Sequence, residues 1–301
     1  MSYRTIMTKF RKLTTQDFRI LLAVEAGMST HEYVPVETIV KYSNLPHGEA
    51  LHRIDKVHHL ALMQRWTGPY VGFALNYAGY DFLALNVLVK THVVEAVGAP
   101  LGVGKEADVH EALTATGEHV ALKFQRLGRI SFRQTKRLRG YAPRASWLFR
   151  SREAAEREFE ALKILFDHAV SVPKPIAQNR NIIAMGIING VELAQCFKLP
   201  KPRELLTETL ENIKKTYVEA QIIHGDLSEF NIIVKPDWRL LIIDWPQYVR
   251  ADHPNAEKLL RRDVENVLKY FSRKFKVKVN PDDALKYVKG VQDRVISRLT
   301  S

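Results

Sequence analysis

Three polar residues in the last third of the chain have the types and spacing of a site for a metal-bound nucleotide. Asp226 is followed five residues later by Asn231, and Asp244 comes after a further apolar stretch. Carboxylate and amide oxygens are ligands that suit Mg²⁺. An Asp, an Asn and a second Asp at these intervals are typical of sites that hold nucleotide metal ions beside a catalytic carboxylate. Asp and Asn also favour ordinary turns, but three at this spacing favour the chemical interpretation.

Further upstream, a glycine turn and a lysine have the features expected of phosphate contacts. The segment 101–109 places Gly102 and Gly104 between two apolar runs. Glycine lets backbone amides approach phosphate oxygens closely, although glycine pairs also mark any hairpin. Lys123 is the one charged residue in the apolar segment 120–124. Its ammonium group needs an anion if it is buried, whereas a lysine at a strand edge would simply reach water.

The elements around these residues are expected to bring them together. Short apolar runs at 232–234 and 240–243 predict two strands that place Asn231 and Asp244 at strand ends facing one cleft. A helix over 151–168 carries several acidic residues, of which Glu158 is chosen as the partner of Lys123 because it directly precedes an apolar position.

The apolar segment 181–188 predicts a buried strand. The backbone of Met185 and Ile187 could meet an adenine edge there, and a plain core strand fits the same pattern equally well. Helices are also expected over 203–221, 256–275 and 281–299.

Charge and composition restrict the class of protein. The 301 residues carry a formal net charge of +12, which points to an anionic partner such as RNA, DNA or a membrane surface. Nine basic residues and no acidic one lie between Phe124 and Arg152, which favours an electrostatic contact site over a solvated loop. No apolar run is long enough to span a bilayer, and the N-terminus lacks the pattern of a secretory signal. With Cys196 as the only cysteine, a cytoplasmic location is expected.

Residues 1–90 predict a small, mainly helical domain. Helical patterns cover 15–27 and 36–42, a third helix is expected to be capped by Ser43 and Asn44, and a hairpin follows over 62–76. Three helices and a hairpin form the pattern of a winged helix-turn-helix. Such a domain often reads nucleic acid with its third helix, and it is also a common protein–protein module.

In this order, the motifs resemble those of the RIO family of atypical protein kinases, over about residues 91–280. The matching segments are 102–108, 123–133, 224–231, 243–247 and 259–267. The preceding winged-helix pattern is similar to the second RIO subfamily, whose members carry such a domain at that place. The resemblance implies an α+β fold, with a winged helix-turn-helix domain followed by a trimmed, bilobal kinase-like domain. The implied boundaries are 1–90 for the winged helix, 91–100 for a linker, 101–188 for an N-lobe with a basic flexible loop at 124–150, and 189–301 for a C-lobe.

The resemblance also implies a role for each matching residue. Asp226 is the catalytic carboxylate, and Asn231 and Asp244 bind Mg²⁺, with Mn²⁺ as an alternative ion. The implied ATP contacts are Gly102, Val103, Gly104, Lys105, Lys123, Glu158, Met185 and Ile187. Ser131 is a candidate autophosphorylation site, and Asp244 is a candidate phosphoaspartate.

The family further implies a serine/threonine kinase or ATPase that acts in maturation of the small ribosomal subunit, with rRNA of the subunit precursor as partner. Two alternatives stay open. One is chiefly an rRNA-binding assembly factor with ATP hydrolysis as a release switch. The other is a small-molecule phosphotransferase of the aminoglycoside or choline type, against which the N-terminal domain weighs.

This chain also departs from the related patterns in three places. Gly186 stands where the family usually has an acidic residue, and Trp245-Pro246 replaces the Phe-Gly of ordinary protein kinases. No Ala-Pro-Glu segment follows Asp244. The peptide-binding subdomains of ordinary kinases therefore have no room in this chain.

Overall fold

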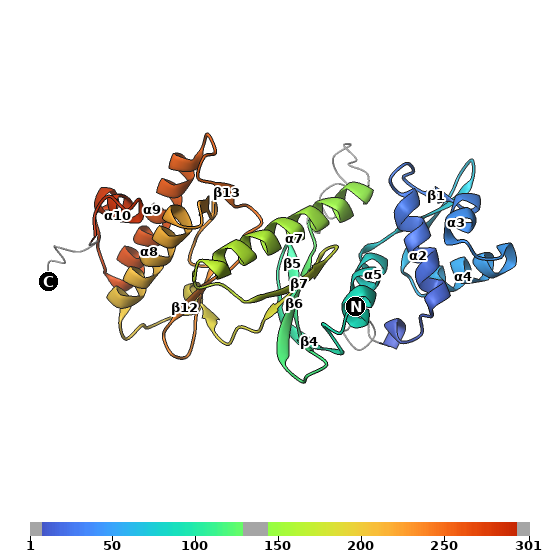
Figure 1. Cartoon of the computed structure of the whole chain (residues 1–301), viewed down its shortest axis with the longest axis horizontal. Coiled ribbons are helices and arrows are strands. Elements are labelled where there is room, and N and C mark those ends of the chain that lie inside the picture. Colours follow the sequence, from blue (N-terminus) through green and yellow to red (C-terminus); the bar gives the residue numbers. More distant parts are fainter. Residues whose placement is uncertain (1–7, 129–143, 294–301) are drawn as a thin grey trace. The chain divides into compact units, whose positions relative to one another are not determined.

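The computed structural model describes residues 8–128 and 144–293 and contains two compact units (Figure 1). The first comprises residues 1–156 and 176–185, and the second comprises 157–175 and 186–301. The helices and strands of the first unit are α2 (Thr15–Gly27), β1 (Val34–Pro35), α3 (Val36–Ser43), α4 (His47–His59), β2 (Met63–Thr67), β3 (Val71–Leu75), α5 (Tyr77–Lys90), β4 (Ala96–Val103), β5 (Ala107–Leu113), β6 (His119–Gln125) and the start of α7 (Arg144–Asp167). Strands β7 (Pro175–Asn179) and β8 (Ile182–Gly186) complete its five-stranded sheet, in the order β4-β5-β6-β8-β7.

The winged helix predicted for the N-terminal residues is present. Helices α2, α3 and α4 precede the antiparallel hairpin β2–β3, in which Met63 pairs with Leu75. The expected cap of the third helix was wrong, because α4 begins after Pro46. Asn44 instead ends α3 in the left-handed conformation (φ 52°), which asparagine tolerates better than most residues.

Two basic residues of α4 serve the fold of the winged helix. Arg53 and Lys56 both bind the carboxylate of Asp17 on α2, which is completely buried. A buried carboxylate needs such partners, because desolvation of an unpaired charge is costly. The third helix therefore directs these two charges inward.

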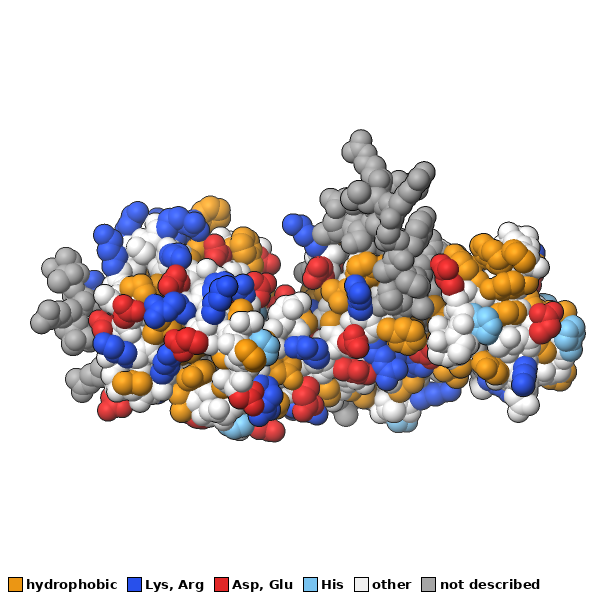
Figure 2. Space-filling view, turned by 90° about the horizontal axis from the view of Figure 1, so that it is seen from above, with side chains coloured by type: hydrophobic (Ala, Val, Ile, Leu, Met, Phe, Trp, Pro, Cys, Tyr) orange, Lys and Arg blue, Asp and Glu red, His pale blue; other side chains and the backbone are white. Residues whose placement is uncertain are grey.

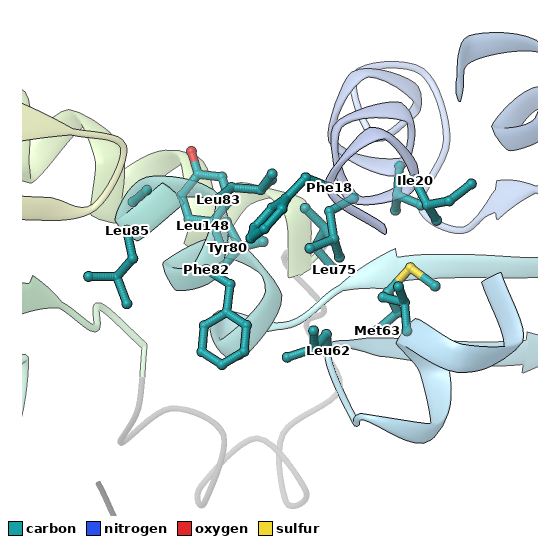
Figure 3. Packing of buried hydrophobic residues seen from close by; sticks show 14 of the residues in the cluster. Phe18, Ile20, Leu62, Met63, Leu75, Tyr80, Phe82, Leu83, Leu85 and Leu148 are labelled. Carbon is teal, nitrogen blue, oxygen red and sulfur yellow. The ribbon is translucent and has the colours of Figure 1, made fainter. Parts of the chain in front are cut away.

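Helix α5 joins the winged helix to the sheet within a single hydrophobic core. Its side chains Tyr80, Phe82, Leu83 and Leu85 are all buried (Figure 3). Residues 79–85 of this helix are all buried, as expected of a helical segment that packs against other elements on several sides. The core cluster runs from the winged helix through α5 to β4, β5, β6, α7 and β8. Residues 96–100, part of the expected linker, belong to strand β4.

The second unit contains the end of α7, several short strands and three helices. Its elements are β9 (Val191–Glu192), the 3₁₀ turn η1 (Leu193–Gln195), α8 (Pro202–Val218), β10 (Ile222–Ile223), β11 (Ile232–Val234), β12 (Leu240–Ile242), β13 (Val249–Arg250), α9 (Ala256–Phe275) and α10 (Pro281–Val288). Strands β12, β11 and β9 form one sheet, and β10 pairs with β13. Helix α10 is shorter than the expected 281–299, because Gly290 follows it with a φ of +73°. Within the two described ranges, no helix is long and apolar enough to cross a membrane.

Candidate active site

The loop that follows β10 carries the predicted catalytic carboxylate. Asp226 is solvent-exposed, while its neighbours Gly225 and Leu227 are buried. Gly225 has a φ of +80°, and a Cβ atom there would lie 2.9 Å from the carbonyl oxygen of Gln247. Only glycine fits this conformation and this close approach without strain. The backbone therefore presents Asp226 to solvent between two buried residues.

His224 connects this loop to the segment that carries Asp244. Its Nε2 atom lies 3.0 Å from the carbonyl oxygen of Ile243, and its Nδ1 atom accepts the backbone N–H of Asp226 at 3.3 Å. Because a carbonyl oxygen only accepts, Nε2 carries the proton and Nδ1 is the acceptor. The imidazole also packs against Trp245, with ring centroids 4.5 Å apart. His224, absent from the predicted site residues, is therefore one direct link between the two acidic segments.

Asn231 provides a second connection among the predicted metal ligands. Its Nδ2 atom donates to the carbonyl oxygen of Asp226 at 2.9 Å, and its own carbonyl oxygen accepts the N–H of Ile243 at the same distance. Asp244 follows with a φ of +69°, a conformation uncommon for non-glycine residues and often found at functional sites. The structure thus brings the surroundings of Asp226, Asn231 and Asp244 together at the end of the β11–β12 pair.

Helix α9 holds the loop that carries Asp226. Asp263 is 1% exposed, and its carboxylate accepts the N–H groups of Gly225 at 2.7 Å and Leu227 at 3.0 Å. Burial raises the pKa of Asp263 to about 6, although the two N–H donors act in the opposite direction. Arg262 donates a hydrogen bond to the carbonyl oxygen of Gly225. Gly225 and Leu227, the two residues that α9 binds, directly precede and follow Asp226.

Asp263 was assigned no role from the sequence, although its place on the apolar face of a predicted helix indicated one. Leu260, Val264 and Val267 define the buried face of α9, and Asp263 lies on that same face. An acid on the apolar face of an amphipathic helix requires hydrogen-bond donors from elsewhere in the fold.

The predicted phosphate-binding residues belong to the first unit. The turn between β4 and β5 is closed by a hydrogen bond from the N–H of Gly104 to the carbonyl oxygen of Ala107, 2.8 Å long. The residues of this turn, Gly102 to Lys105, are exposed. Lys123 is buried on β6, as expected for a lysine that needs an anion. Glu158, on the part of α7 that belongs to the second unit, is also buried. Their pairing stays a prediction.

The predicted adenine-binding strand is shorter than expected. Strand β8 ends at Gly186, whose N–H donates to the carbonyl oxygen of Lys174 at 2.8 Å. Met185 is buried on the strand, and Ile187 follows it. Their contact with adenine stays a prediction. Ser131 lies outside the described residues.

The donor set of the second unit fits Mg²⁺ bound together with a phosphate. Among residues 8–128 and 144–293, there is no group of three or more His, Cys, Asp or Glu residues that could hold a metal by itself. Mg²⁺ usually keeps several waters and takes one or two protein oxygens together with substrate phosphates. Asn231 and Asp244 supply such oxygens from neighbouring segments.

Comparisons with known proteins assign both parts of the chain. A family model described as "RIO domain" matches residues 108–284, and one described as "Rio2, N-terminal" matches residues 10–91. The chain belongs to the Rio2 family of serine/threonine kinases. The predicted winged helix followed by a RIO kinase domain, and the predicted ATP-dependent kinase activity, are thereby confirmed.

Several relatives of this Rio2-family kinase cover most of its length. The RIO-type serine/threonine-protein kinase Rio2 of Methanocaldococcus jannaschii is 40% identical, over 87% of this chain and 99% of the relative. The serine/threonine-protein kinase RIO2 of Saccharomyces cerevisiae is 32% identical, over 94% of this chain and 69% of the relative. A crystal structure of the Chaetomium thermophilum Rio2 kinase, described as an ADP/Mg²⁺-phosphoaspartate complex, matches with a TM-score of 0.83 at 35% identity, over 93% of this chain and 88% of that chain.

Proposed function

We propose that this kinase transfers the γ-phosphoryl group of ATP at a site formed by the residues that the sequence predicts. The turn 102–105 and Lys123 contact the phosphates, and Glu158 holds Lys123. Met185 and Ile187 present their backbone to adenine. Asn231 and Asp244 hold Mg²⁺, or Mn²⁺, which neutralises charge on the phosphates when bound. The observation that carries this proposal is the hydrogen-bonded connection of Asp226, Asn231 and Ile243, because it holds together the backbone segments that carry the proposed acid and the two proposed metal ligands.

Four residues of the second unit have distinct roles in this proposal. Asp226 orients an attacking hydroxyl group so that its oxygen lies in line with the γ-phosphorus atom, and it accepts the proton of this group. His224 and Asn231 hold the backbone around Asp226. Asp263 fixes the same loop from α9 through two N–H groups. With this loop fixed on three sides, Asp226 needs little reorganisation when the substrate binds.

The acceptor in an autophosphorylation reaction is proposed to be Asp244. A carboxylate oxygen of Asp244 forms a bond to the γ-phosphorus atom while the bond between this atom and the β–γ bridging oxygen breaks, so that ADP leaves and an aspartyl-phosphate remains. The description of the Chaetomium thermophilum structure as a phosphoaspartate complex supports this assignment. The positive φ of Asp244 supports it as well, because strained backbone is often retained at functional positions. Ser131 is proposed as a second acceptor.

Replacing Asp244 with asparagine is expected to remove the aspartyl-phosphate. The amide also carries no charge, so the Mg²⁺ concentration needed for half-maximal ADP binding should rise by about tenfold or more. Loss of a group that merely supports a metal ligand already lowers metal affinity by about tenfold, and loss of the charged ligand itself should cost at least as much. The measurement is hydroxylamine-sensitive label from γ-³²P-ATP, together with a Mg²⁺ titration of ADP binding. Asp237→Asn, at an exposed turn, is the matched control. Unchanged label in Asp244→Asn would contradict the assignment.

We further infer that the partner is rRNA in a precursor of the small ribosomal subunit. The net charge of +12 and the basic segment 124–152 support an anionic partner. On the face shown in Figure 2, Lys and Arg side chains are interspersed with Asp and Glu. Because Arg53 and Lys56 of α4 bind the buried carboxylate of Asp17, the phosphate contacts are assigned to the basic segment, of which Arg150 and Arg152 are described and exposed. Arg152 also pairs with Glu156 at 2.7 Å, but both side chains of this pair are exposed.

The double substitution Arg150→Gln and Arg152→Gln is expected to weaken rRNA binding and its dependence on salt. Each lost phosphate contact lowers the slope of log K against log salt by about 1, so this slope should fall by about 2. Filter binding of small-subunit rRNA across a salt series measures it. Lys163→Gln with Lys269→Gln removes the same charge from exposed ion pairs elsewhere and should leave the slope unchanged. An affinity that does not depend on salt would refute the electrostatic contact.

A further inference from the structure

A buried polar cluster lies where α5 meets the five-stranded sheet of the first unit. It consists of Asp81, Asp108, Arg126 and Asn181 and is called the Arg126 cluster below. The guanidinium group of Arg126 binds both carboxylate oxygens of Asp81, at 2.8 Å and 2.7 Å, and its Nε atom lies 3.3 Å from the carboxylate of Asp108. Asn181 donates to Asp81 at 2.9 Å. One cation therefore connects a carboxylate of the winged helix domain with one of the sheet.

The cluster is built to keep its charges inside the protein. The side chains of Arg126, Asp81 and Asp108 are each at most 12% exposed. The guanidinium group also lies over the rings of Tyr77 and Phe124, at 5.2 Å and 5.4 Å from their centroids. Burial by itself lowers the pKa of Arg126, but the two carboxylates outweigh burial and raise this pKa, so the cation is retained. A bidentate guanidinium–carboxylate pair also fixes the orientation of the two side chains relative to each other, which a lysine ammonium group would not do.

Arg126 holds the β4–β5 turn at two points. Its backbone N–H donates to the carbonyl oxygen of Glu106, within the turn, at 2.6 Å. Its side chain binds Asp108, the second residue of β5 after that turn. In the sheet, Asp108 pairs with Val103 on β4 and with Phe124 on β6. The orientation of Arg126 thus determines where the base of the glycine turn lies.

We propose that Asp81 is a positioning residue for nucleotide binding: by orienting Arg126, it sets the position of Asp108 and of the turn 102–107. The proposal rests on the proposed function, in which this turn contacts the ATP phosphates. The winged helix domain then contributes a side chain to the organisation of the nucleotide site through Asp81 of α5. In the absence of Asp81, the guanidinium group turns toward Asp108 and displaces the turn, because it has a single remaining carboxylate partner in the cluster.

The test is Asp81→Asn in the full chain, with ATP turnover and ADP binding measured separately. The KM for ATP and the Kd for ADP are expected to rise by about tenfold, the size typical of losing a group that orients a direct ligand, while kcat stays within about twofold. Asp108→Asn, which removes the charge that Arg126 binds next to the turn, should give the same rise in KM. A variant that merely weakened the fold would instead lower the amount of active protein and leave KM unchanged.

Glu25→Gln is the matched control. Glu25 on α2 and Arg180 between β7 and β8 form another two-pronged ion pair within the first unit, at 2.8 Å and 2.6 Å, with no hydrogen bond to the β4–β5 turn among the described residues. This substitution should leave the KM for ATP unchanged. The proposal is overturned if Asp81→Asn and Glu25→Gln give the same KM, or if Asp108→Asn leaves KM at the wild-type value.

A double substitution, and a substitution at a residue proposed to contact the phosphates directly, complete the experiment. If Asp81 acts through Arg126, adding Asp81→Asn to Arg126→Met should change KM no further. Equal fold-changes in both backgrounds would overturn the proposal. Lys123→Met reports on the proposed function by itself. If Lys123→Met leaves ATP binding intact, the assigned phosphate site is wrong; if it abolishes binding while Asp81→Asn has no effect, only the positioning role fails.

Discussion

Replacing Asp226 with asparagine is expected to lower the rate of phosphoryl transfer to a hydroxyl acceptor, such as the proposed Ser131, by about 10²- to 10⁴-fold, the usual share of a general base. Asparagine keeps the shape of the side chain and cannot take a proton from the acceptor hydroxyl group. The backbone N–H and carbonyl groups of Asp226 keep their bonds to His224 and Asn231, so the loop should hold its conformation. Single-turnover transfer from γ-³²P-ATP, counted as label that resists hydroxylamine and is therefore bound to a hydroxyl group, measures the chemical step, and ADP affinity measured in parallel reports on binding.

The affinity for Mg²⁺-bound ADP should change little in this variant, because Asn231 and Asp244 are the proposed metal ligands. Asp252→Asn, at an exposed carboxylate 3.8 Å from Arg250, removes one negative charge from the same unit and should retain full activity. A loss of ADP binding with normal turnover per bound nucleotide would show that Asp226 is a binding residue and not the base.

Replacing Asp263 with alanine is expected to reduce both stability and catalysis. The N–H groups of Gly225 and Leu227 would lose their acceptor inside the protein, at about 1–3 kcal/mol for each group, partly offset because a buried carboxylate is no longer desolvated. Asp226 lies between these two residues, so kcat should fall by about tenfold or more, as for other groups that support a catalytic residue. Thermal unfolding and single-turnover rates measure the two effects.

Asp263→Asn provides a graded comparison at the same position. Its amide retains one acceptor oxygen, so both the melting temperature and kcat should lie between those of the wild-type and the alanine variant. Asp282→Asn, which removes an exposed partner of Arg261, should match the wild-type in both measurements. If the alanine variant is as active as wild-type, the hydrogen bonds from α9 do not position the catalytic loop.

Local residue patterns were sufficient to predict most elements of this kinase. Helix α9 has the predicted bounds, and the strands β11 and β12 flank Asn231 and Asp244 as the two apolar runs indicate. The resemblance to the family rests on motifs that include Asp226, Asn231 and Asp244, whose types and intervals are typical of metal and phosphate chemistry. Such constraints act along a short stretch of chain, so they can be read without coordinates.

Element ends were predicted less well where a cap or a single hydrogen bond decides them. Asn44 caps the end of α3 and not the start of α4, and Gly290 ends α10 early. In each case, one residue in the left-handed conformation ends the helix. Local composition does not show whether such a residue closes one helix or opens the next.

The tertiary structure alone decided which buried charges meet. Asp263 is 37 residues from Asp226, yet it binds the backbone N–H of Gly225 next to Asp226. Asp81 is 45 residues from Arg126, yet the two side chains form an ion pair. Sequence spacing cannot predict such pairs, because desolvation requires a buried charge to have a partner without specifying where in the chain that partner lies. The sequence by itself therefore determined the reaction class and the chemical groups of the proposed site. The fold determined the hydrogen bonds and ion pairs that hold these groups in place.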